Sequence, residues 1–226
     1  DSGHDAPLSL DPGDGAVTVV DGITSAALPT DDRGLHYGDG VFETIALHED
    51  LPQHWARHLA RMEAGARRLG IAPPDEPQWL ADLMLALADA PAAPRRVLKL
   101  ILTRGSGGRG YAPPTPATPR RLLQLTAWPS WPADIAHTGI RLALCGTPLG
   151  RNRLLAGIKH LNRLEQVLGA AELAASEAQE GLMFDDRGVL VEGTRTNVFV
   201  VIDGCLLTPV LDEAGIEGIM RSLVLD

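Results

Sequence analysis

The chain has 226 residues, 45% of them hydrophobic, and a formal net charge of −9 at pH 7. That length can bury a substantial core as one large domain or two small ones. No run approaches the roughly 18 apolar residues that a membrane-spanning helix needs, so the sequence predicts a globular protein that does not cross a membrane. The acidic balance argues against nucleic acid as the main partner, because phosphate contacts require clustered lysine and arginine.

The N-terminal residues and the two cysteines bear on order and compartment. Residues 1–16 are polar, and we expect them to form a disordered leader. Cys145 and Cys205 stand in apolar, strand-like contexts without the spacing of metal ligands. This predicts two small buried side chains, no metal site and a reducing, cytosolic compartment.

Residues 17–127 have the pattern of a small α+β domain. Residues 17–20 predict a strand that turns at Asp21-Gly22 into a hairpin. Residues 41–47 alternate apolar and polar side chains and predict a second strand. The glycines at 34, 38 and 40 stand among charged residues before it, and indicate either an ordinary loop or a pocket wall.

Two helices and two strands complete this half. Residues 54–69 carry one apolar stripe, which consists of Trp55, Leu59, Met62, Ala66 and Leu69. Periodicity alone places the arginines at 57, 61 and 68 on a solvated basic face opposite that stripe. Residues 78–90 predict a second helix with a proline in its first turn. Residues 96–103 and 122–127 predict strands, and residues 128–134, rich in Trp and Pro, predict a stiff linker between domains.

A dense glycine cluster, RGSGGRGY, follows the strand at 96–103 and occupies residues 104–111. No Lys-Ser/Thr pair follows it, which argues against a nucleotide P-loop. One interpretation is a flexible surface hairpin. The other is a mobile substrate loop, in which Arg109 and Tyr111 face the ligand, because arginine matches carboxylates with two hydrogen bonds.

Residues 135–226 predict a strand at 140–145, a helix at 161–178 and then two hairpins. The first hairpin joins residues 182–184 and 189–192, and the second joins 198–202 and 205–208. Glu192 lies between two apolar strands, where a solvent-facing glutamate is the commoner case and a buried partner the alternative. Residues 215–221 indicate a glycine loop that enters a helix, whose first amides can hold an anion.

Lys159 is the residue on which we place the chemistry. It stands in RNRLLAGIKHLNRLEQVL, residues 151–168, where an extended segment is about to become an amphipathic helix. Lys99 and Lys159 are the only lysines among 20 basic residues. A rigid, partly dry lysine near other cations has a lowered pKa, which frees the amine to form a Schiff base with a carbonyl. A solvated surface lysine is the alternative.

Taken together, RGSGGRGY, residues 151–168 and Glu192 resemble the fold-type IV pyridoxal-phosphate enzymes. These include branched-chain and D-amino-acid transaminases and the lyases that act on 4-amino-4-deoxychorismate, and the resemblance is strongest to the lyases. It covers about residues 32–221. It implies an α+β fold with a small N-terminal α/β sandwich (17–127) and a larger, barrel-like mixed α/β C-terminal domain (135–226), here truncated relative to the family. It also implies a homodimer.

The resemblance implies roles for cofactor-binding residues. Lys159 matches the lysine that binds pyridoxal 5'-phosphate covalently, and Glu192 matches the carboxylate that faces the pyridine nitrogen. Arg61 matches the phosphate-binding arginine, and we therefore expect it in the site and not on the solvated face that helical periodicity predicts. Ile219 and Met220 match two residues whose backbone amides reach the phosphate; a threonine common at the second position is absent here.

Three further positions follow from the same resemblance. Ile216 matches an aliphatic residue that packs on the cofactor ring, and Arg109 and Tyr111 are the candidates for contact with a dicarboxylate substrate. The expected activity is a lyase of folate biosynthesis that converts 4-amino-4-deoxychorismate to 4-aminobenzoate and pyruvate. Three alternatives stay open: a transaminase of the same fold, a non-catalytic scaffold, and a phosphate- or nucleotide-binding module built on residues 104–111.

Overall fold

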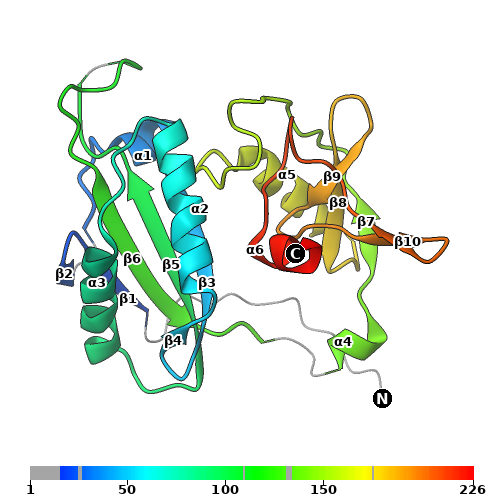
Figure 1. The fold of residues 1–226 in the computed structure, drawn as a ribbon, viewed down its shortest axis with the longest axis horizontal. Helices are drawn as coiled ribbons and strands as arrows, with labels where there is room; N and C mark the ends of the chain where they lie inside the picture. The colour runs from blue at the N-terminus through cyan, green and yellow to red at the C-terminus, as the bar shows by residue number, and fades with distance from the viewer. Residues whose placement is uncertain (1–15, 25–26, 109, 131–133, 175) are drawn as a thin grey trace.

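The computed structural model describes residues 16–24, 27–108, 110–130, 134–174 and 176–226. The expected disordered leader therefore lies, except for residue 16, outside the described residues. Figure 1 shows the elements in two groups, one before and one after residue 130. The domain division at 128–134 remains a prediction.

A six-stranded antiparallel sheet forms the first group, with strand order β2-β1-β6-β5-β3-β4. Its strands are β1 (Val17–Val20), β2 (Ile23–Thr24), β3 (Gly40–His48), β4 (Leu51–Pro52), β5 (Arg95–Thr103) and β6 (Arg120–Ala127). Its helices are α1 (Arg33–Tyr37), α2 (Trp55–Arg68) and α3 (Glu76–Asp89). The two long helices and the long strands lie within one or two residues of the ranges that the sequence predicts, whereas α1 lies in a stretch predicted as loop.

The turn between β1 and β2 is the predicted two-residue hairpin. Val20 pairs with Ile23, and Asp21 and Gly22 between them have φ angles of 49° and 84°. Two successive positive φ angles are those of a turn whose twist matches the flanking strands, and Asp-Gly is a preferred sequence for it. The local sequence therefore fixes this reversal.

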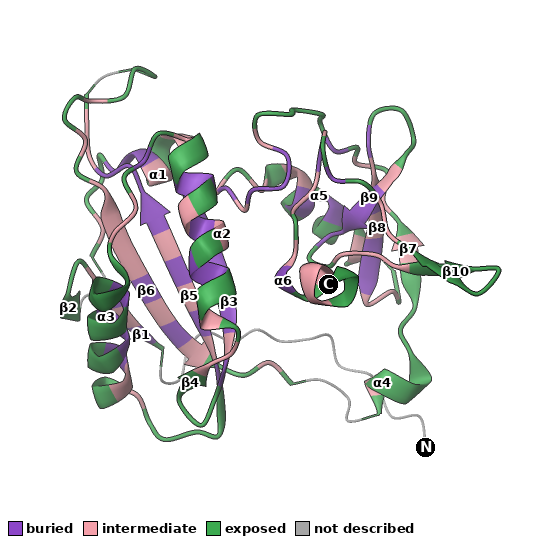
Figure 2. Ribbon diagram, viewed as in Figure 1, coloured by how far each residue is buried: buried purple, intermediate pink, exposed green. Residues whose placement is uncertain are grey.

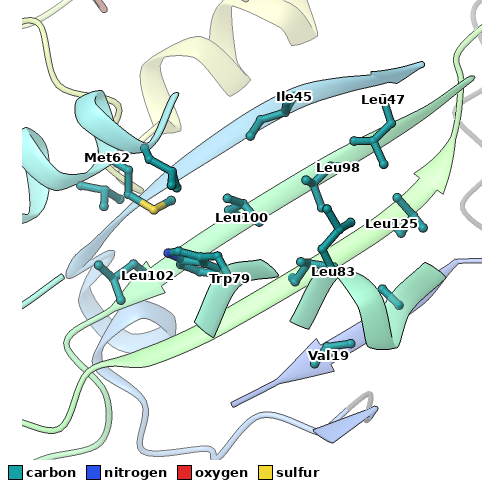
Figure 3. Packing of buried hydrophobic residues seen from close by; sticks show 14 of the residues in the cluster. Val19, Ile45, Leu47, Met62, Trp79, Leu83, Leu98, Leu100, Leu102 and Leu125 are labelled. Atoms are coloured by element: carbon teal, nitrogen blue, oxygen red, sulfur yellow. The ribbon is translucent and has the colours of Figure 1, made fainter. Parts of the chain in front are cut away.

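One face of the sheet packs against α2 and α3, and this contact forms the main core (Figure 3). Alternate residues of the central strands point to this face, and Ile45, Leu98 and Leu100 are 0% exposed. Trp79 of α3 and Met62 of α2 cover them from the helical side. The opposite face carries the residues in between and is only partly covered, as Figure 2 shows along β5 and β6.

The second group has a three-stranded sheet of order β7-β8-β9 and a separate hairpin, β10-β11. The strands are β7 (Leu142–Leu144), β8 (Glu180–Phe184), β9 (Leu190–Gly193), β10 (Val200–Ile202) and β11 (Cys205–Leu207). The helices are α4 (Ile135–Thr138), α5 (Leu164–Leu173) and α6 (Ile219–Leu225). A smaller core joins Leu149, Met183, Val191, Leu211 and Ala214.

Two expectations for this half are wrong in detail. The helix predicted at 161–178 spans only Leu164–Leu173. At its beginning, Leu161 belongs to the backbone pairing with β3, since its amide donates to the carbonyl of Gly40. Cys205 is exposed and Cys145 only half-buried. The β10-β11 hairpin pairs with no other strand in the described part of the chain, so its apolar residues remain exposed (Figure 2).

We predict that Leu100→Ala lowers the free energy of unfolding by about 2–5 kcal/mol, because it opens a cavity at the centre of the main core. Urea denaturation followed by circular dichroism measures the change. Met84→Ala is the matched control, since Met84 on α3 is 72% exposed and its truncation changes stability by about 0.5 kcal/mol or less. Equal effects of the two variants would contradict this description of the core.

Candidate active site

The segment that carries Lys159 runs beside the edge of β3. The amide of Phe42 donates to the carbonyl of Lys159 at 2.9 Å, and the amide of Leu161 donates to the carbonyl of Gly40 at 3.0 Å. These bonds extend the six-stranded sheet by a short antiparallel stretch. Lys159 is therefore held on an extended backbone and not on a mobile loop.

The other edge of this segment pairs with residues 215–217. The amide of Gly157 donates to the carbonyl of Gly215 at 2.9 Å, and the amide of Glu217 donates to the carbonyl of Gly157 at 3.0 Å. Gly157 and Gly215 have φ angles of 82° and 84°. Glycine adopts this left-handed conformation without strain, so the glycines at both positions permit the close pairing.

An exposed ion cluster fixes the beginning of the same segment. Glu213 accepts hydrogen bonds from the side chains of Arg151, Arg153 and Arg187, and its carbonyl accepts from the amide of Asn152 at 2.7 Å. Hydrogen bonds from Arg153 and Arg151 lower the pKa of Glu213 to about 2. The carboxylate is thus charged at any physiological pH, and it ties three arginines to one point.

The side chain of Lys159 is half-buried and lies over an aromatic ring. Its Nζ is 4.3 Å from the centroid of the Phe42 ring. Burial lowers the pKa of Lys159 to about 8, with further lowering by the nearby charge of Arg61 and an opposing effect of Glu43. A substantial fraction of this amine is therefore neutral near physiological pH, as a nucleophile or a base requires.

Arg61 is paired with a buried carboxylate. Its Nε donates to Oε1 of Glu43 at 2.8 Å and its Nη2 to Oε2 at 2.5 Å, while Nδ1 of His58 lies 2.7 Å from Oε2. Glu43 is 0% exposed. Burial opposes its ionisation, but the hydrogen bonds from His58 and Arg61 outweigh this and lower the pKa of Glu43. The solvated basic face that helical periodicity predicts is wrong for Arg61, whose side chain is 14% exposed.

The third donor group of Arg61 faces the beginning of α6. Its Nη1 donates to the carbonyl of Glu217 at 2.8 Å. Gly218 precedes α6 in an extended conformation, and Ile219 and Met220 are the first two helical residues. The first amides of a helix have no acceptor inside the helix, so this guanidinium and these amides form one positive region.

Glu192 is buried, 4% exposed, and held at both oxygens. Its Oε2 accepts from the amide of Ile216 at 2.8 Å, and its Oε1 accepts from Nε2 of Gln166 at 3.1 Å. Burial raises the pKa of Glu192, and these two hydrogen bonds oppose the shift. The solvent-facing interpretation of Glu192 is therefore wrong. Ile216, which the family resemblance places on the cofactor ring, is half-buried, and its backbone amide orients this carboxylate; the ring contact of its side chain stays a prediction.

Polar atoms without partners lie close to Glu192. Nε of Arg163 and Oε1 of Gln166 are two of the buried side-chain atoms that lack a hydrogen-bond partner among the described residues. Nη2 of Arg163 lies 2.9 Å from Nδ1 of His160. Burial and the charge of Arg163 lower the pKa of His160 to about 4, which keeps this ring neutral. The side of the site next to α5 thus keeps unused hydrogen-bonding capacity.

Two residues of this site escaped the sequence analysis. Glu43 shares its strand face with the buried Val41 and Ile45, and this alternation was a signal for a buried carboxylate that needs a cation. Lys99 pairs with Thr44 across β3 and β5, and its Nζ lies 5.5 Å from the centroid of the Phe42 ring. Both lysines of the chain therefore flank one phenylalanine, which no local pattern indicated.

Of the two predicted substrate residues, Tyr111 is among those that the structure describes. Arg109 lies outside the described residues. Tyr111 is 84% exposed, and its ring contacts Tyr37 at a centroid distance of 5.4 Å. A cavity of about 270 Å³ lies between Tyr111 and His160, and Lys159 does not line it. The substrate roles of Arg109 and Tyr111 stay predictions.

Among the residues that the structure describes, no group of three His, Cys, Asp or Glu side chains is placed to hold a metal ion. Over those same residues, no helix has the length and apolar character that crossing a bilayer requires.

Comparison with known proteins places this geometry in a family. Residues 40–226 match the family Amino-transferase class IV, and the chain belongs to this family. It is 35% identical over 207 residues to an aminodeoxychorismate lyase of Vibrio harveyi, with 92% of this chain and 75% of that protein covered. These matches confirm the resemblance that residues 104–111 and 151–168 indicated.

Solved structures agree with this placement. The crystal structure of 4-amino-4-deoxychorismate lyase from Pseudomonas aeruginosa superposes with a TM-score of 0.85 at 45% identity, over 92% of this chain and 76% of that one. The branched-chain amino acid aminotransferase of Escherichia coli shares the fold, with a TM-score of 0.80 at 21% identity. The superposition covers 93% of this chain and 73% of that one. The predicted α+β, fold-type IV class is confirmed.

We predict that the Lys159 amine of the cofactor-free protein titrates near pH 8, well below the ordinary 10.5, because burial disfavours its ammonium form. Lysine-selective ¹³C NMR measures the midpoint, and Lys99→Arg leaves a single lysine signal to follow. Glu43→Gln in that background removes a nearby negative charge and moves the midpoint to lower pH. A midpoint above 10 would show that this amine is solvated.

Proposed function

We propose that this chain is a pyridoxal-phosphate-dependent lyase that converts 4-amino-4-deoxychorismate to 4-aminobenzoate and pyruvate. The observation that supports it best is a half-buried lysine of lowered pKa, placed between a buried carboxylate and an arginine at a helix start. The 45% identity to the Pseudomonas aeruginosa lyase favours this reaction over others of the family. Folate biosynthesis is the pathway that this product implies.

The residues around Lys159 fit pyridoxal phosphate. The unpaired Nε of Arg163 and Oε1 of Gln166 offer polar contacts beside Glu192. Gly215 is tightly enclosed, since a Cβ there would meet Cγ1 of Val191 at 2.7 Å and Oε2 of Glu192 at 3.2 Å. A glycine at this position therefore lets the backbone of residues 215–217 pack closely against Val191 and Glu192.

The phosphate end of the cofactor has a matching site. Arg61 would bind the phosphate together with the amides of Ile219 and Met220, and Ile216 would pack against the ring. Met220 has no hydroxyl, so the phosphate receives one hydrogen bond fewer than a threonine there would give. Glu43 accepts from Nε and Nη2 of Arg61 and the Glu217 carbonyl accepts from Nη1, so a phosphate would bind the remaining N–H groups of Nη1 and Nη2.

When bound through Lys159, the cofactor supplies an electron sink for the substrate carbon that carries nitrogen. Once the substrate amine has taken its place on the cofactor, the free Nζ of Lys159 would act as the base that takes the proton from this carbon, a role that its lowered pKa favours. The ether bond to the enolpyruvyl group would break, and this group would leave with a proton as enolpyruvate, which becomes pyruvate, while the remaining ring becomes aromatic. Glu192, fixed by Gln166 and Ile216, would hold its carboxylate toward the ring nitrogen.

The dicarboxylate substrate needs positive partners on the same face. Lys99 lies over the ring of Phe42, as Lys159 does, and its ammonium is the cation that we assign to one substrate carboxylate. Arg109 and Tyr111 are proposed as further substrate contacts from residues 104–111. We also propose a homodimer, which the family resemblance implies, and a cytosolic location, which the two cysteines without metal-ligand spacing favour.

A transaminase is the second candidate, because the Escherichia coli branched-chain enzyme shares the fold and the family includes both activities. It would use the same Lys159 and Glu192. Incubation with an amino acid and a 2-oxo acid, followed by amino-acid analysis, separates the two functions. Amino transfer without formation of 4-aminobenzoate from aminodeoxychorismate would replace the lyase assignment.

We predict that Lys159→Ala lowers the rate of 4-aminobenzoate formation by a factor on the order of 1,000 or more, because it removes both the covalent attachment and the base. Fluorescence of the released 4-aminobenzoate measures turnover. Lys99→Ala is the control, because it removes the other lysine near the Phe42 ring and should mainly raise KM. Full lyase activity in the Lys159 variant would end this assignment.

A separate prediction concerns the phosphate site. Arg61→Lys should weaken binding of pyridoxal phosphate by about tenfold, since a single ammonium cannot serve both Glu43 and a phosphate. Binding of pyridoxal, which lacks the phosphate, should change less than about twofold. Quenching of tryptophan fluorescence measures both affinities. Equal weakening for the two aldehydes would show that Arg61 does not bind the phosphate.

A further inference from the structure

A buried guanidinium holds the backbone of an exposed segment at residues 110–112. Arg33 of α1 is 3% exposed. Its Nη2 donates to the carbonyl of Tyr111 at 2.8 Å, and its Nη1 lies 3.1 Å from the carbonyl of Gly110 and 3.4 Å from that of Ala112. One side chain thus reaches three successive carbonyls that are 77 to 79 residues away in sequence.

Arg33 is itself fixed from the opposite side. Its Nε donates to Oδ2 of Asp39 at 2.8 Å, and its Cζ lies 4.8 Å from the centroid of the Tyr37 ring. Burial opposes ionisation of Asp39, but hydrogen bonds from Arg104 and Arg33 lower its pKa. The guanidinium is therefore oriented by a charged carboxylate and an aromatic face before it meets the segment.

The position of Tyr111 depends on this arrangement. Its side chain is 84% exposed, and the contact recorded for its ring is the edge-on one with Tyr37. Arg33 therefore contacts both tyrosines: it lies over the ring of Tyr37 and binds the backbone carbonyl of Tyr111. Without the hydrogen bonds to the three carbonyls, little else in the described structure would keep Tyr111 beside the cavity of about 270 Å³ that both tyrosines line.

We propose that Arg33 is a positioning residue for substrate binding, which sets the placement of Tyr111 through the backbone of residues 110–112. This inference rests on the proposed function, in which Tyr111 contacts the substrate. A lysine at this position keeps the charge opposite Asp39 but lacks the planar fork that reaches several carbonyls at once. Arg33→Lys therefore separates the positioning role from the charge.

The first test needs no turnover. The chain has two tyrosines, Tyr37 and Tyr111, so tyrosine-selective NMR gives two ring systems, which Tyr111→Phe assigns. The wild-type protein should show a nuclear Overhauser effect between the two rings, and Arg33→Lys should lose it. Arg104→Lys is the matched control, because Arg104 also binds Asp39 but donates to the carbonyls of Leu69 and Gly70 at the end of α2.

The second test measures coupling in the holoenzyme. Arg33→Lys should raise KM for aminodeoxychorismate at least about tenfold, equivalent to about 1.4 kcal/mol, and change kcat less than about threefold. In a Tyr111→Ala background the same substitution should raise KM less than about twofold, since the residue that it positions is gone. Arg33→Gln gives the same comparison should the lysine variant not fold.

The outcomes separate this inference from the proposed function. Absence of lyase activity in the wild-type enzyme would overturn the function, while the ring-to-ring signal would still decide whether Arg33 places Tyr111. Retention of that signal in Arg33→Lys would overturn the positioning role. So would an equal rise in KM on Arg33→Lys in the wild-type and in the Tyr111→Ala backgrounds. A fall in kcat of Arg33→Lys with an unchanged KM would also overturn the positioning role.

Discussion

The structure depends on one extended segment that is hydrogen-bonded on both edges. Residues 157–161 pair with β3 on one side and with residues 215–217 on the other, so the two halves of the chain meet at this backbone. These bonds fix the backbone from which the Lys159 side chain extends, and its amine lies over the ring of Phe42. Burial of the amine, together with the nearby charge of Arg61, lowers the pKa of Lys159.

The charges around this segment compensate one another locally. The chain is acidic overall, yet Arg61, Lys99 and Arg163 gather near Lys159. Glu43 balances Arg61 and is held by His58, so a carboxylate that is 0% exposed remains ionised. This pairing keeps the arginine in one orientation at the start of α6. A buried carboxylate without these partners would be neutral, and the guanidinium would lose its anchor.

The sequence indicated the parts of this site but not their pairing. Periodicity predicted α2 and the main strands, because apolar residues at steps of three and four indicate a helix and alternating ones indicate a strand. The motif around Lys159 pointed to that residue, and the role of Glu192 came from the family resemblance, because the local pattern favoured a solvent-facing side chain. The pairing of Glu43 with Arg61 depends on how α2 packs against β3, and the placement of Lys99 near the Phe42 ring depends on the register of β3 with β5. Local patterns encode neither arrangement. α1, with Arg33 inside it, lies in a stretch predicted as loop, because a helix of five residues is too short to show an apolar period.

The central claim is that the Lys159 amine forms the covalent link to pyridoxal phosphate. Treatment of the cofactor-loaded protein with borohydride, followed by peptide mass spectrometry, tests it directly, because Lys99 is the only other lysine to be distinguished. The account predicts one reduced cofactor on the peptide that contains Lys159 and none on the peptide with Lys99. An unmodified Lys159 peptide, or modification at Lys99 alone, would contradict it.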